Sequence, residues 1–234
     1  MIGAIVSYHN QSDTIDGCIK SIEKQCETLD CRVIVYVIDD ASAPKLSLSK
    51  SLYSLPVACV RASHNVGVQR VRNFGFHLMK KHSPEYVIFV DGDVEFADGA
   101  FSKMKAAIET GGDGVAYAYG HFSRRGALTG RQVSAPFSAE RLRRYNYIST
   151  MSLIKYNILA KTYPRPFVED EDRFQDWSLW LRLLNRGYTG AFVNSVLFSA
   201  YFSGDGISTN SVVDYQEWRR IVHERYNQTQ KGVC

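Results

Sequence analysis

The amino-acid sequence predicts an α/β protein with a doubly wound, mainly parallel sheet flanked by helices. The first observation is a series of short apolar runs rich in β-branched residues, each about as long as a buried strand. The second is helical periodicity in most of the segments between these runs. Strands that alternate with helices imply parallel strands joined by right-handed crossovers.

Four strands are expected in the first half of the chain: Ile2 to Tyr8, Arg32 to Ile38, Val57 to Val60, and Tyr86 to Val90. Three helices are expected between and after them. The first carries Ile15, Cys18, Ile19, Ile22 and Cys26 on one face, with Asp13 as its N-cap. The second carries Val68, Val71, Gly75, Leu78 and Met79, and the third, after Asp98, carries Phe101, Met104 and Ile108.

The second half has a looser pattern. Residues Gly120 to Pro136 contain three glycines and three arginines without either period, which predicts a mobile or ligand-contacting loop. A helix is expected from Trp177 to Arg186, with Gly187 at the C′ position. A strand is expected over Gly190 to Phe202 and a closing helix over Tyr215 to Arg225. We expect one domain over residues 1–234, because this length suits one substantial core.

The composition is that of an ordinary globular protein, with 45% hydrophobic and 22% charged residues. No apolar run approaches the length of a membrane span. The five cysteines are odd in number and lack C-x-x-C spacing, which favours a reducing, cytoplasmic location without disulfides. A net charge of +4 suits an anionic small molecule or an anionic surface, and it is far from a nucleic-acid footprint.

Polar residues follow three of the predicted strands, where ligands of open parallel sheets bind. They are Ser7 at the end of the first strand, Asp39 and Asp40 after the second, and Asp91 and Asp93 after the fourth. For Asp39 and Asp40, a simple turn is an equally good interpretation.

Asp91 and Asp93 form a D-x-D pair whose side chains leave the same face of an extended chain. Two carboxylates this close repel each other unless a cation or a proton lies between them. Mg²⁺ or Mn²⁺ with one or two protein carboxylates, water and phosphate fits this pattern, and Gly92 would let a ligand approach the backbone. The alternative is a capped turn before the helix that follows Asp98.

Five segments in order and spacing resemble family 2 glycosyltransferases of the GT-A fold, and the resemblance covers most of the chain. They are IVSYHNQSDTIDGCIKSI, VIVYVIDDAS, SHNVGVQRVRNFGF, YVIFVDGDVEF and QDWSLWLRLLNRGY. The resemblance implies inverting transfer of a sugar from a nucleotide-diphosphate sugar, with a UDP-sugar expected first, to a hydroxyl of a glycan or glycoconjugate. It also implies a nucleotide-binding half at 1–115 and an acceptor and catalytic half at 116–234.

The resemblance assigns roles to individual residues. Ser7, Asp39 and Asp40 would contact the base and ribose, and Arg72 would point towards the nucleotide and its phosphates. Asp91 and Asp93 would hold Mn²⁺ or Mg²⁺ at the diphosphate, with Asp93 as the direct ligand. Asp176 would be the general base.

Several assignments compete with these. Glu169, Asp170, Glu171 and Asp172 are alternatives to Asp176 as the base, and Asp176 is preferred because it directly precedes a helix whose N-terminus fixes its position. Some relatives have a C-terminal histidine at the metal or phosphate, which this chain lacks in YFSGDGISTN; Asp205 or Ser208 are alternatives there. The basic run RLRR at 141–144 leaves peripheral membrane contact open, with a solvated helix face preferred.

Three other classes of protein share part of this pattern. A haloacid-dehalogenase-type phosphatase also opens with a strand and D-x-D, but it places Thr or Val where this chain has Glu95. A nucleotidyltransferase would have a G-x-G-T-R loop after the first strand, which is missing. The presence of Asp91, Asp93 and Asp176 argues against an inactive sugar-nucleotide-binding protein. Glu95 shares a face with the D-x-D pair by strand alternation, which makes it a candidate to support the ligating residues without being a metal ligand itself.

Overall fold

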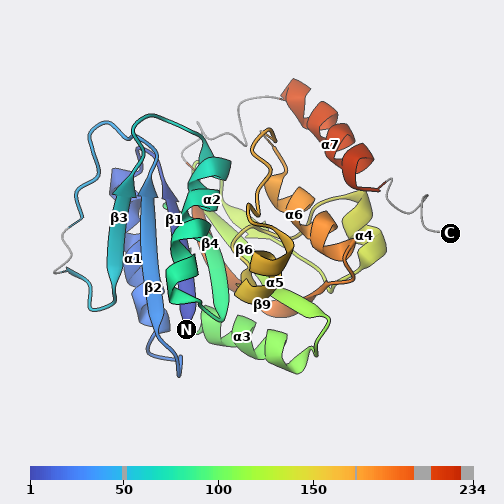
Figure 1. The fold of residues 1–234 in the computed structure, drawn as a ribbon, viewed down its shortest axis with the longest axis horizontal. Helices are drawn as coiled ribbons and strands as arrows, with labels where there is room; N and C mark the ends of the chain where they lie inside the picture. The colour runs from blue at the N-terminus through green and yellow to red at the C-terminus, as the bar shows by residue number, and fades with distance from the viewer. Residues whose placement is uncertain (49–51, 172, 203–211, 228–234) are drawn as a thin grey trace.

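The computed structural model describes residues 1–48, 52–171, 173–202 and 212–227 (Figure 1). In these residues the strands are β1 (Ile2–Tyr8), β2 (Val33–Asp39), β3 (Val57–Arg61), β4 (Tyr86–Asp91), β5 (Val94–Phe96), β6 (Val115–Gly126), β7 (Gly130–Gln132), β8 (Leu153–Lys155) and β9 (Thr189–Phe202). The helices are α1 (Ser12–Gln25), α2 (Val68–Met79), α3 (Ala100–Thr110), α4 (Ala139–Arg144), α5 (Tyr156–Thr162), α6 (Gln175–Leu184) and α7 (Val212–Asn227), with a 3₁₀ turn at Lys80–His82.

The described strands form one sheet in the order β3-β2-β1-β4-β8-β6-β9-β5, with β7 beside β6. The first four strands are parallel to one another. Beyond β4 the sheet is mixed, because β8 is antiparallel to both β4 and β6 while β9 runs parallel to β6. This arrangement confirms the predicted α/β class with helices on both faces of the sheet (Figure 1).

Alternate residues of the central strands enter two different cores. On β1, Ile2, Ala4 and Val6 face a core completed by α1 and α3, whereas Ile5 faces a core completed by α2, α5 and α6. All four residues are fully buried. A parallel strand covered on both faces must be apolar at successive positions, which is why the strands are visible as continuous apolar runs in the sequence.

Helix α2 packs unusually closely on β1, and this contact places the site residues that α2 carries. A Cβ atom added at Gly75 would lie 2.3 Å from Cγ2 of Ile5, a distance that no side chain tolerates. Gly75 therefore lets the helix approach the strand at a point where any larger residue would push it away.

Most predicted elements are confirmed to within a residue or two, including β1, α2 and β9. The predicted loop at Gly120 to Pro136 is wrong in part, because β6 continues to Gly126 and β7 pairs with it as a hairpin. The expected N-cap Asp13 is also wrong, since Gln11 is the N-cap of α1 and Asp13 lies in the first turn. A ligand-binding loop and a polar β-hairpin have similar amino-acid compositions. Composition alone therefore does not reveal that these residues pair as strands.

Trp177 and Trp180 face the core and are 1% and 0% exposed. Each indole N–H donates to a backbone oxygen, from Trp177 to Leu142 at 2.6 Å and from Trp180 to Ile148 at 3.1 Å. These two bonds hold α6 against the segment around α4. The N-terminus of α6 is thereby fixed with respect to residues 142–148.

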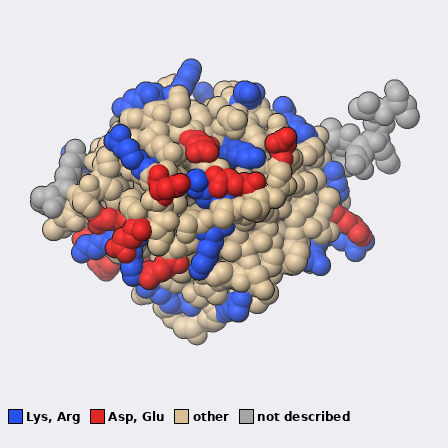
Figure 2. Space-filling view, turned by 90° about the horizontal axis from the view of Figure 1, so that it is seen from below, with Lys and Arg blue, Asp and Glu red and all other residues tan. Residues whose placement is uncertain are grey.

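Charged side chains of both signs are interspersed on the face seen in Figure 2. This distribution agrees with a net charge of only +4. No helix in the part of the chain that the structure describes combines the length and apolar composition that a membrane span needs.

Candidate active site

The carboxyl ends of β1, β2 and β4 lie side by side, so that three predicted site residues meet at one level of the sheet. Ser7 is aligned with Asp91 across β1 and β4, and Tyr8 with Asp39 across β1 and β2. The Ser7 hydroxyl donates to Oδ1 of Asp91 at 2.9 Å. The strand ends thus build one polar edge, as expected for a ligand site of an open parallel sheet.

Arg72 reaches this edge from α2. Its Nη2 lies 2.6 Å from Oδ1 of Asp91, and its guanidinium lies over the ring of Phe167, 5.2 Å from the centroid. The Arg72 side chain is only 4% exposed, and its Nε is buried without a hydrogen-bond partner. A buried guanidinium with an unused donor, next to a partly exposed carboxylate, is suited to an anionic ligand at this edge.

Asp39 is fully buried, and its negative charge is compensated by a hydrogen bond and an ion pair. Its Oδ1 accepts from the backbone N–H of Ser42 at 2.8 Å, and its Oδ2 lies 2.6 Å from Nη1 of Arg61. Burial by itself raises the pKa of the carboxyl, but the hydrogen bonds from Ser42 and the charge of Arg61 outweigh it and leave the pKa below its ordinary value. The side chain therefore stays ionised at neutral pH.

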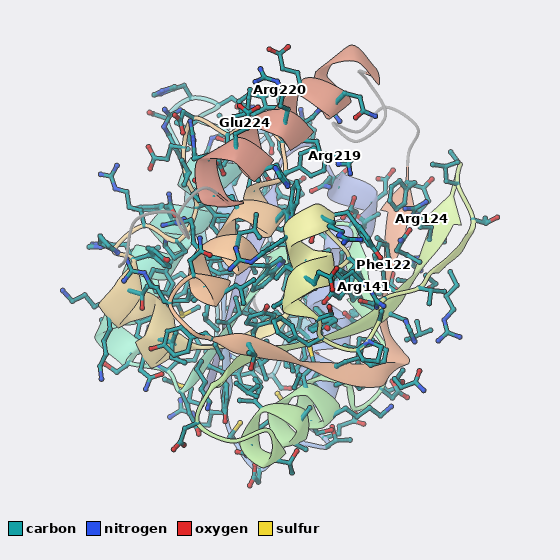
Figure 3. All side chains as sticks on the ribbon, turned by 90° about the vertical axis from the view of Figure 1, so that its right-hand side faces the viewer. Phe122, Arg124, Arg141, Arg219, Arg220 and Glu224 are labelled. Carbon is teal, nitrogen blue, oxygen red and sulfur yellow. The ribbon has the colours of Figure 1, made fainter. Side chains whose placement is uncertain are left out.

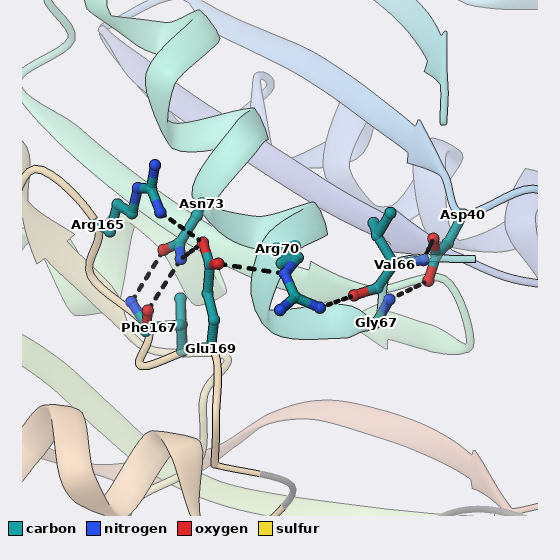
Figure 4. A network of polar contacts seen from close by, with 8 residues as sticks. All are labelled: Asp40, Val66, Gly67, Arg70, Asn73, Arg165, Phe167 and Glu169. Carbon is teal, nitrogen blue, oxygen red and sulfur yellow. Dashed lines mark hydrogen bonds and ion pairs between the residues drawn. The ribbon is translucent and has the colours of Figure 1, made fainter. Parts of the chain in front are cut away.

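Asp40 holds the loop that leads into α2. Its two carboxylate oxygens accept from the backbone N–H groups of Val66, at 2.7 Å, and Gly67, at 3.0 Å (Figure 4). Gly67 is the N-cap of α2 and has φ of +88°, a conformation that favours glycine. Asp40 thus fixes the start of the helix that carries Arg72. A contact between Asp40 and a nucleotide stays a prediction.

Asp91 ends β4 and Asp93 lies in the turn that leads to β5, so the two carboxylates of the D-x-D pair do not lie along one continuous strand. Burial, and then the charge of Asp91, raise the pKa of Asp93 to about 7, although Arg125 and Arg72 act in the opposite direction. This repulsion is what two carboxylates show before a cation compensates them. The pair therefore fits a divalent cation.

Gly92 has a different role from the expected one. A Cβ atom at Gly92 would lie 2.9 Å from Oε1 of Gln11 and 3.3 Å from the backbone oxygen of Ser7. The protein itself fills the space beside this glycine. Gly92 allows the turn to pack against the start of α1, and the prediction that it admits a ligand to the backbone is wrong.

The described residues contain no group of three or more His, Cys, Asp or Glu side chains placed to hold a metal ion. Asp91 and Asp93 still suit Mg²⁺ or Mn²⁺, since such ions commonly take one or two protein carboxylates and complete their shell with water and phosphate oxygens. The alternative ligands Asp205 and Ser208 lie outside the described residues.

Asp176 is the second residue of α6, which begins at Gln175 with Phe174 as N-cap, so it lies inside the helix and does not precede it. Its Oδ1 accepts from the N–H of Trp177 at 2.8 Å, and its side chain is hydrogen-bonded to Asn146. Burial raises the pKa of Asp176, while these hydrogen bonds and the charge of Arg72 act in the opposite direction. Arg72 therefore acts electrostatically on both Asp93 and Asp176.

The neighbouring acidic residues have other partners. Glu169 lies 3.2 Å from Nε of Arg70 and 3.4 Å from Nη1 of Arg165 (Figure 4). Glu171 is fully buried and accepts from the Tyr226 hydroxyl at 2.7 Å. Arg225 lies 3.1 Å from Glu171 and 3.5 Å from Asp170. Asp172 lies outside the described residues.

Residues that the sequence did not indicate join these parts. The Asn73 side chain exchanges two hydrogen bonds of 2.9 Å with the backbone of Phe167 (Figure 4). Gln69 donates to the backbone oxygen of Glu171. Asn73 follows Arg72 in the RVRN segment. Its burial, which indicates a hydrogen-bond partner elsewhere in the protein, is visible only in the structure.

The sequence matches the glycosyl transferase family 2 profile over residues 4–164. The chain belongs to glycosyl transferase family 2. This membership argues against the phosphatase alternative. So does the place of the D-x-D pair in the chain, since three strands precede the strand that carries it. No curated protein matches the sequence of this family 2 domain.

Solved structures of TarS from S. aureus share the GT-A fold of this family 2 domain. One TarS chain is 16% identical with a TM-score of 0.69, covering 94% of this domain and 38% of TarS. TarS 1–349 in complex with UDP-GlcNAc is 17% identical with a TM-score of 0.70, covering 94% of this domain and 65% of that chain. The complex of TarS 1–349 with UDP is 17% identical with a TM-score of 0.67, covering 94% and 64%. At these identities the likeness shows the fold alone.

Proposed function

We propose that the chain transfers a sugar from a nucleotide-diphosphate sugar, with a UDP-sugar as the first candidate, to a hydroxyl of a glycan or glycoconjugate. The observation that carries this proposal is the position of the buried Arg72, whose Nη2 lies 2.6 Å from Oδ1 of Asp91 while its Nε has no hydrogen-bond partner. A buried cation with an unused donor thus lies at the predicted diphosphate site. Family membership supports the reaction class, and the UDP-GlcNAc and UDP complexes of TarS support the nucleotide.

In this proposal Ser7, Asp39 and Asp40 lie at the nucleoside, and Asp91 and Asp93 hold Mn²⁺ or Mg²⁺ at the diphosphate. When bound, such a cation would compensate negative charge on the departing diphosphate. Arg72 has the same effect from the α2 side, and its buried position makes its charge stronger than it would be in water. Asp91 is kept in place by Ser7 and Arg72 on one oxygen, Oδ1.

The chemical step is a displacement with inversion. The acceptor hydroxyl oxygen forms a bond to the anomeric carbon while the bond from that carbon to the diphosphate oxygen breaks. The electron pair of the broken bond leaves with the nucleoside diphosphate. The hydroxyl proton passes to the carboxylate of Asp176, and such general-base assistance typically contributes about 10² to 10⁴ in rate.

Two observations support Asp176 over its neighbours as the base. Burial raises its pKa, which brings a carboxylate closer to the pKa that suits a base at neutral pH. Glu169, Asp170 and Glu171 are engaged in ion pairs with arginines that hold the segment before α6. These contacts give the three side chains a structural role in this segment.

A thermal-shift panel tests the donor site. The protein is heated with UDP, GDP, CMP or dTDP, each with and without Mn²⁺, and Asp93→Ala is measured in parallel. We expect one nucleotide, UDP first, to raise the melting temperature of the wild type much more with Mn²⁺ than without it. Stabilisation that ignores Mn²⁺, or that is unchanged in Asp93→Ala, overturns the metal-diphosphate part of the proposal.

A further inference from the structure

Arg125 forms an ion pair beside the D-x-D turn that the proposed mechanism does not use. Its Nη2 lies 2.6 Å from Oε1 of Glu95. Arg125 is the penultimate residue of β6, and Glu95 is the middle residue of β5. These strands are not neighbours, because β9 lies between them in the sheet.

The strand register places Arg125 close to Asp93. Arg125 is aligned with Tyr201 on the parallel strand β9. The backbone N–H of Tyr201 in turn donates to the backbone oxygen of Asp93 at 3.0 Å. Arg125 and Asp93 are therefore about two strand spacings apart, roughly 10 Å between backbones, a gap that long side chains bridge.

Glu95 gives Arg125 a fixed support. A Cβ atom at Gly17 would lie only 2.6 Å from Oε1 of Glu95, so this carboxylate lies directly against the backbone of α1. The same Oε1 binds Arg125. Gly17 leaves the space that Glu95 occupies, and the Arg125 guanidinium is thereby anchored to α1.

The Arg125 guanidinium has hydrogen-bonding capacity left over. Its Nε is buried and makes no hydrogen bond, while the side chain as a whole is 40% exposed. A guanidinium offers five N–H donors, and planar anions such as phosphate and carboxylate match its geometry. Arg72 thus lies at Asp91 and Arg125 at Glu95, two residues beyond Asp93, and the Nε of each is buried without a hydrogen-bond partner, as is that of Arg124.

We propose that Arg125, held by Glu95, is a second cationic contact for the diphosphate of the donor, in addition to Arg72. This inference rests on the proposed function and assigns a role to Glu95, which positions Arg125 and contacts no ligand itself. The ligand class is a diphosphate, whether free or attached to a nucleoside.

Arg124 provides a matched control. It is the next residue of the same strand, and it has the same charge. Its Nη2 donates to Oε1 of Gln132 at 2.8 Å, and its guanidinium lies 5.3 Å from the Phe202 ring centroid and 5.9 Å from that of Phe122. Figure 3 shows Arg124 and Phe122 on the face that also presents Arg141 and α7. Arg124→Gln therefore changes the net charge of the protein by the same amount as Arg125→Gln but leaves the ion pair of Arg125 with Glu95 intact.

The test measures dissociation constants by calorimetry for UDP, inorganic pyrophosphate and uridine, all with Mn²⁺, in wild type, Arg125→Gln, Arg124→Gln and Glu95→Gln. We expect Arg125→Gln to weaken UDP and pyrophosphate about tenfold or more, as for a charge-assisted hydrogen bond, and to leave uridine unchanged. Arg124→Gln should stay within about twofold of wild type for all three ligands. Glu95→Gln should weaken the two diphosphates less than Arg125→Gln, because the guanidinium remains but loses its anchor.

Any other result contradicts either the role of Arg125, the proposed function, or both. Diphosphate binding by Arg125→Gln within about twofold of wild type, or an equal loss in Arg124→Gln, overturns the inference alone. A wild type that binds pyrophosphate but not UDP overturns the nucleotide part of the proposed function, and the pyrophosphate data still decide the role of Arg125. A wild type that binds neither ligand overturns both. If Arg125→Gln does not fold, Arg125→Lys decides, with a weakening of both diphosphates expected because the bidentate geometry is lost.

Discussion

The guanidinium of Arg72 and the carboxylate of Asp91 lie 2.6 Å apart, with the arginine side chain 4% exposed and the aspartate side chain 34% exposed. The buried partner comes from α2, and the partly exposed partner ends β4. One side of the pair is therefore fixed by packing while the other faces the site. An ion pair of this kind orients a positive charge before any ligand arrives, which is the requirement for electrostatic stabilisation of a leaving group.

Removal of the Arg72 charge should destabilise the protein, because Asp91 and Asp93 then repel each other without compensation. For Arg72→Met we expect the free energy of unfolding to fall by about 1–3 kcal/mol, less than for a fully buried pair since Asp91 is partly exposed. Urea denaturation measures it. The control Arg70→Met, on the same helix with a side chain 56% exposed, should change stability by less than about 1 kcal/mol. Equal effects of the two substitutions would contradict this account.

Asp93 should make the metal-free protein less stable as the pH rises. Its pKa is raised from 3.8 to about 7, so its contribution to stability is present below pH 3.8 and is lost as the pH rises through 7. Asp93→Asn removes this effect, so its melting temperature should exceed that of wild type more at pH 8 than at pH 5, by about 2–4 °C per kcal/mol. Differential scanning calorimetry in EDTA measures both. A difference that does not grow with pH would be incompatible with the repulsion.

Asp176→Asn should separate binding from turnover. We expect kcat to fall by about 10² to 10⁴, because the proton acceptor is lost, while UDP affinity with Mn²⁺ stays within about twofold. The assay uses the sugar donor and acceptor pair identified by a nucleotide-sugar screen. Asp170→Asn is the control, with a side chain 71% exposed, and should retain turnover. Substantial residual transfer by Asp176→Asn would move the role of the base to the segment at 169–172.

The pH dependence of kcat should show the raised pKa of Asp176. A base must be ionised, so activity falls as the pH drops through the pKa, and burial places that acidic limb above the ordinary carboxylate value of 3.8. Asp93 also titrates in the free protein, so the profile is measured at two saturating Mn²⁺ concentrations. The limb should be the same at both. An acidic limb at the ordinary value would exclude Asp176 as the base.

Gly75→Ala should loosen the contact that positions α2. The added methyl group would lie 2.3 Å from Cγ2 of Ile5, and overpacking of this kind destabilises by about 1–3 kcal/mol. Gly114→Ala is the control, because nothing lies within 4 Å of its added Cβ. Chemical denaturation compares the two variants. UDP binding by Gly75→Ala should weaken as well, since Arg72 moves with the helix, and unchanged stability would show that the core adapts.

The parts of the fold that the sequence predicted are those with a strong local pattern. β1 and β4 are buried on both faces, so they appear as apolar runs, and α2 has a clear apolar face. By contrast β5, β7 and β8 have three residues each, and α4 and α5 have six and seven. Elements of one turn or a few residues are too short to show a period, and their conformation depends on partners distant in the chain.

In the candidate site too, features with a local sequence pattern were predictable, and features that depend on distant parts of the chain were not. D-x-D and Arg72 are visible as motifs, but the ion pair between Glu95 and Arg125 depends on β9, which enters the sheet between β5 and β6 and comes last of the three in the chain. No local pattern contains that information. The roles of the site residues, the division into a nucleotide-binding and an acceptor half, and the cytoplasmic location stay predictions.

The segment between Phe167 and Trp177 is fixed at both ends, by the paired hydrogen bonds of Asn73 at Phe167 and by the indole bond of Trp177 to Leu142. Its residue count is therefore as much a part of the site as its chemistry. Because both ends are held, an insertion or deletion of one residue has to be taken up between these two anchors, beside Asp176. The length of this stretch is therefore constrained by its anchors, and substitution experiments alone would not reveal that constraint.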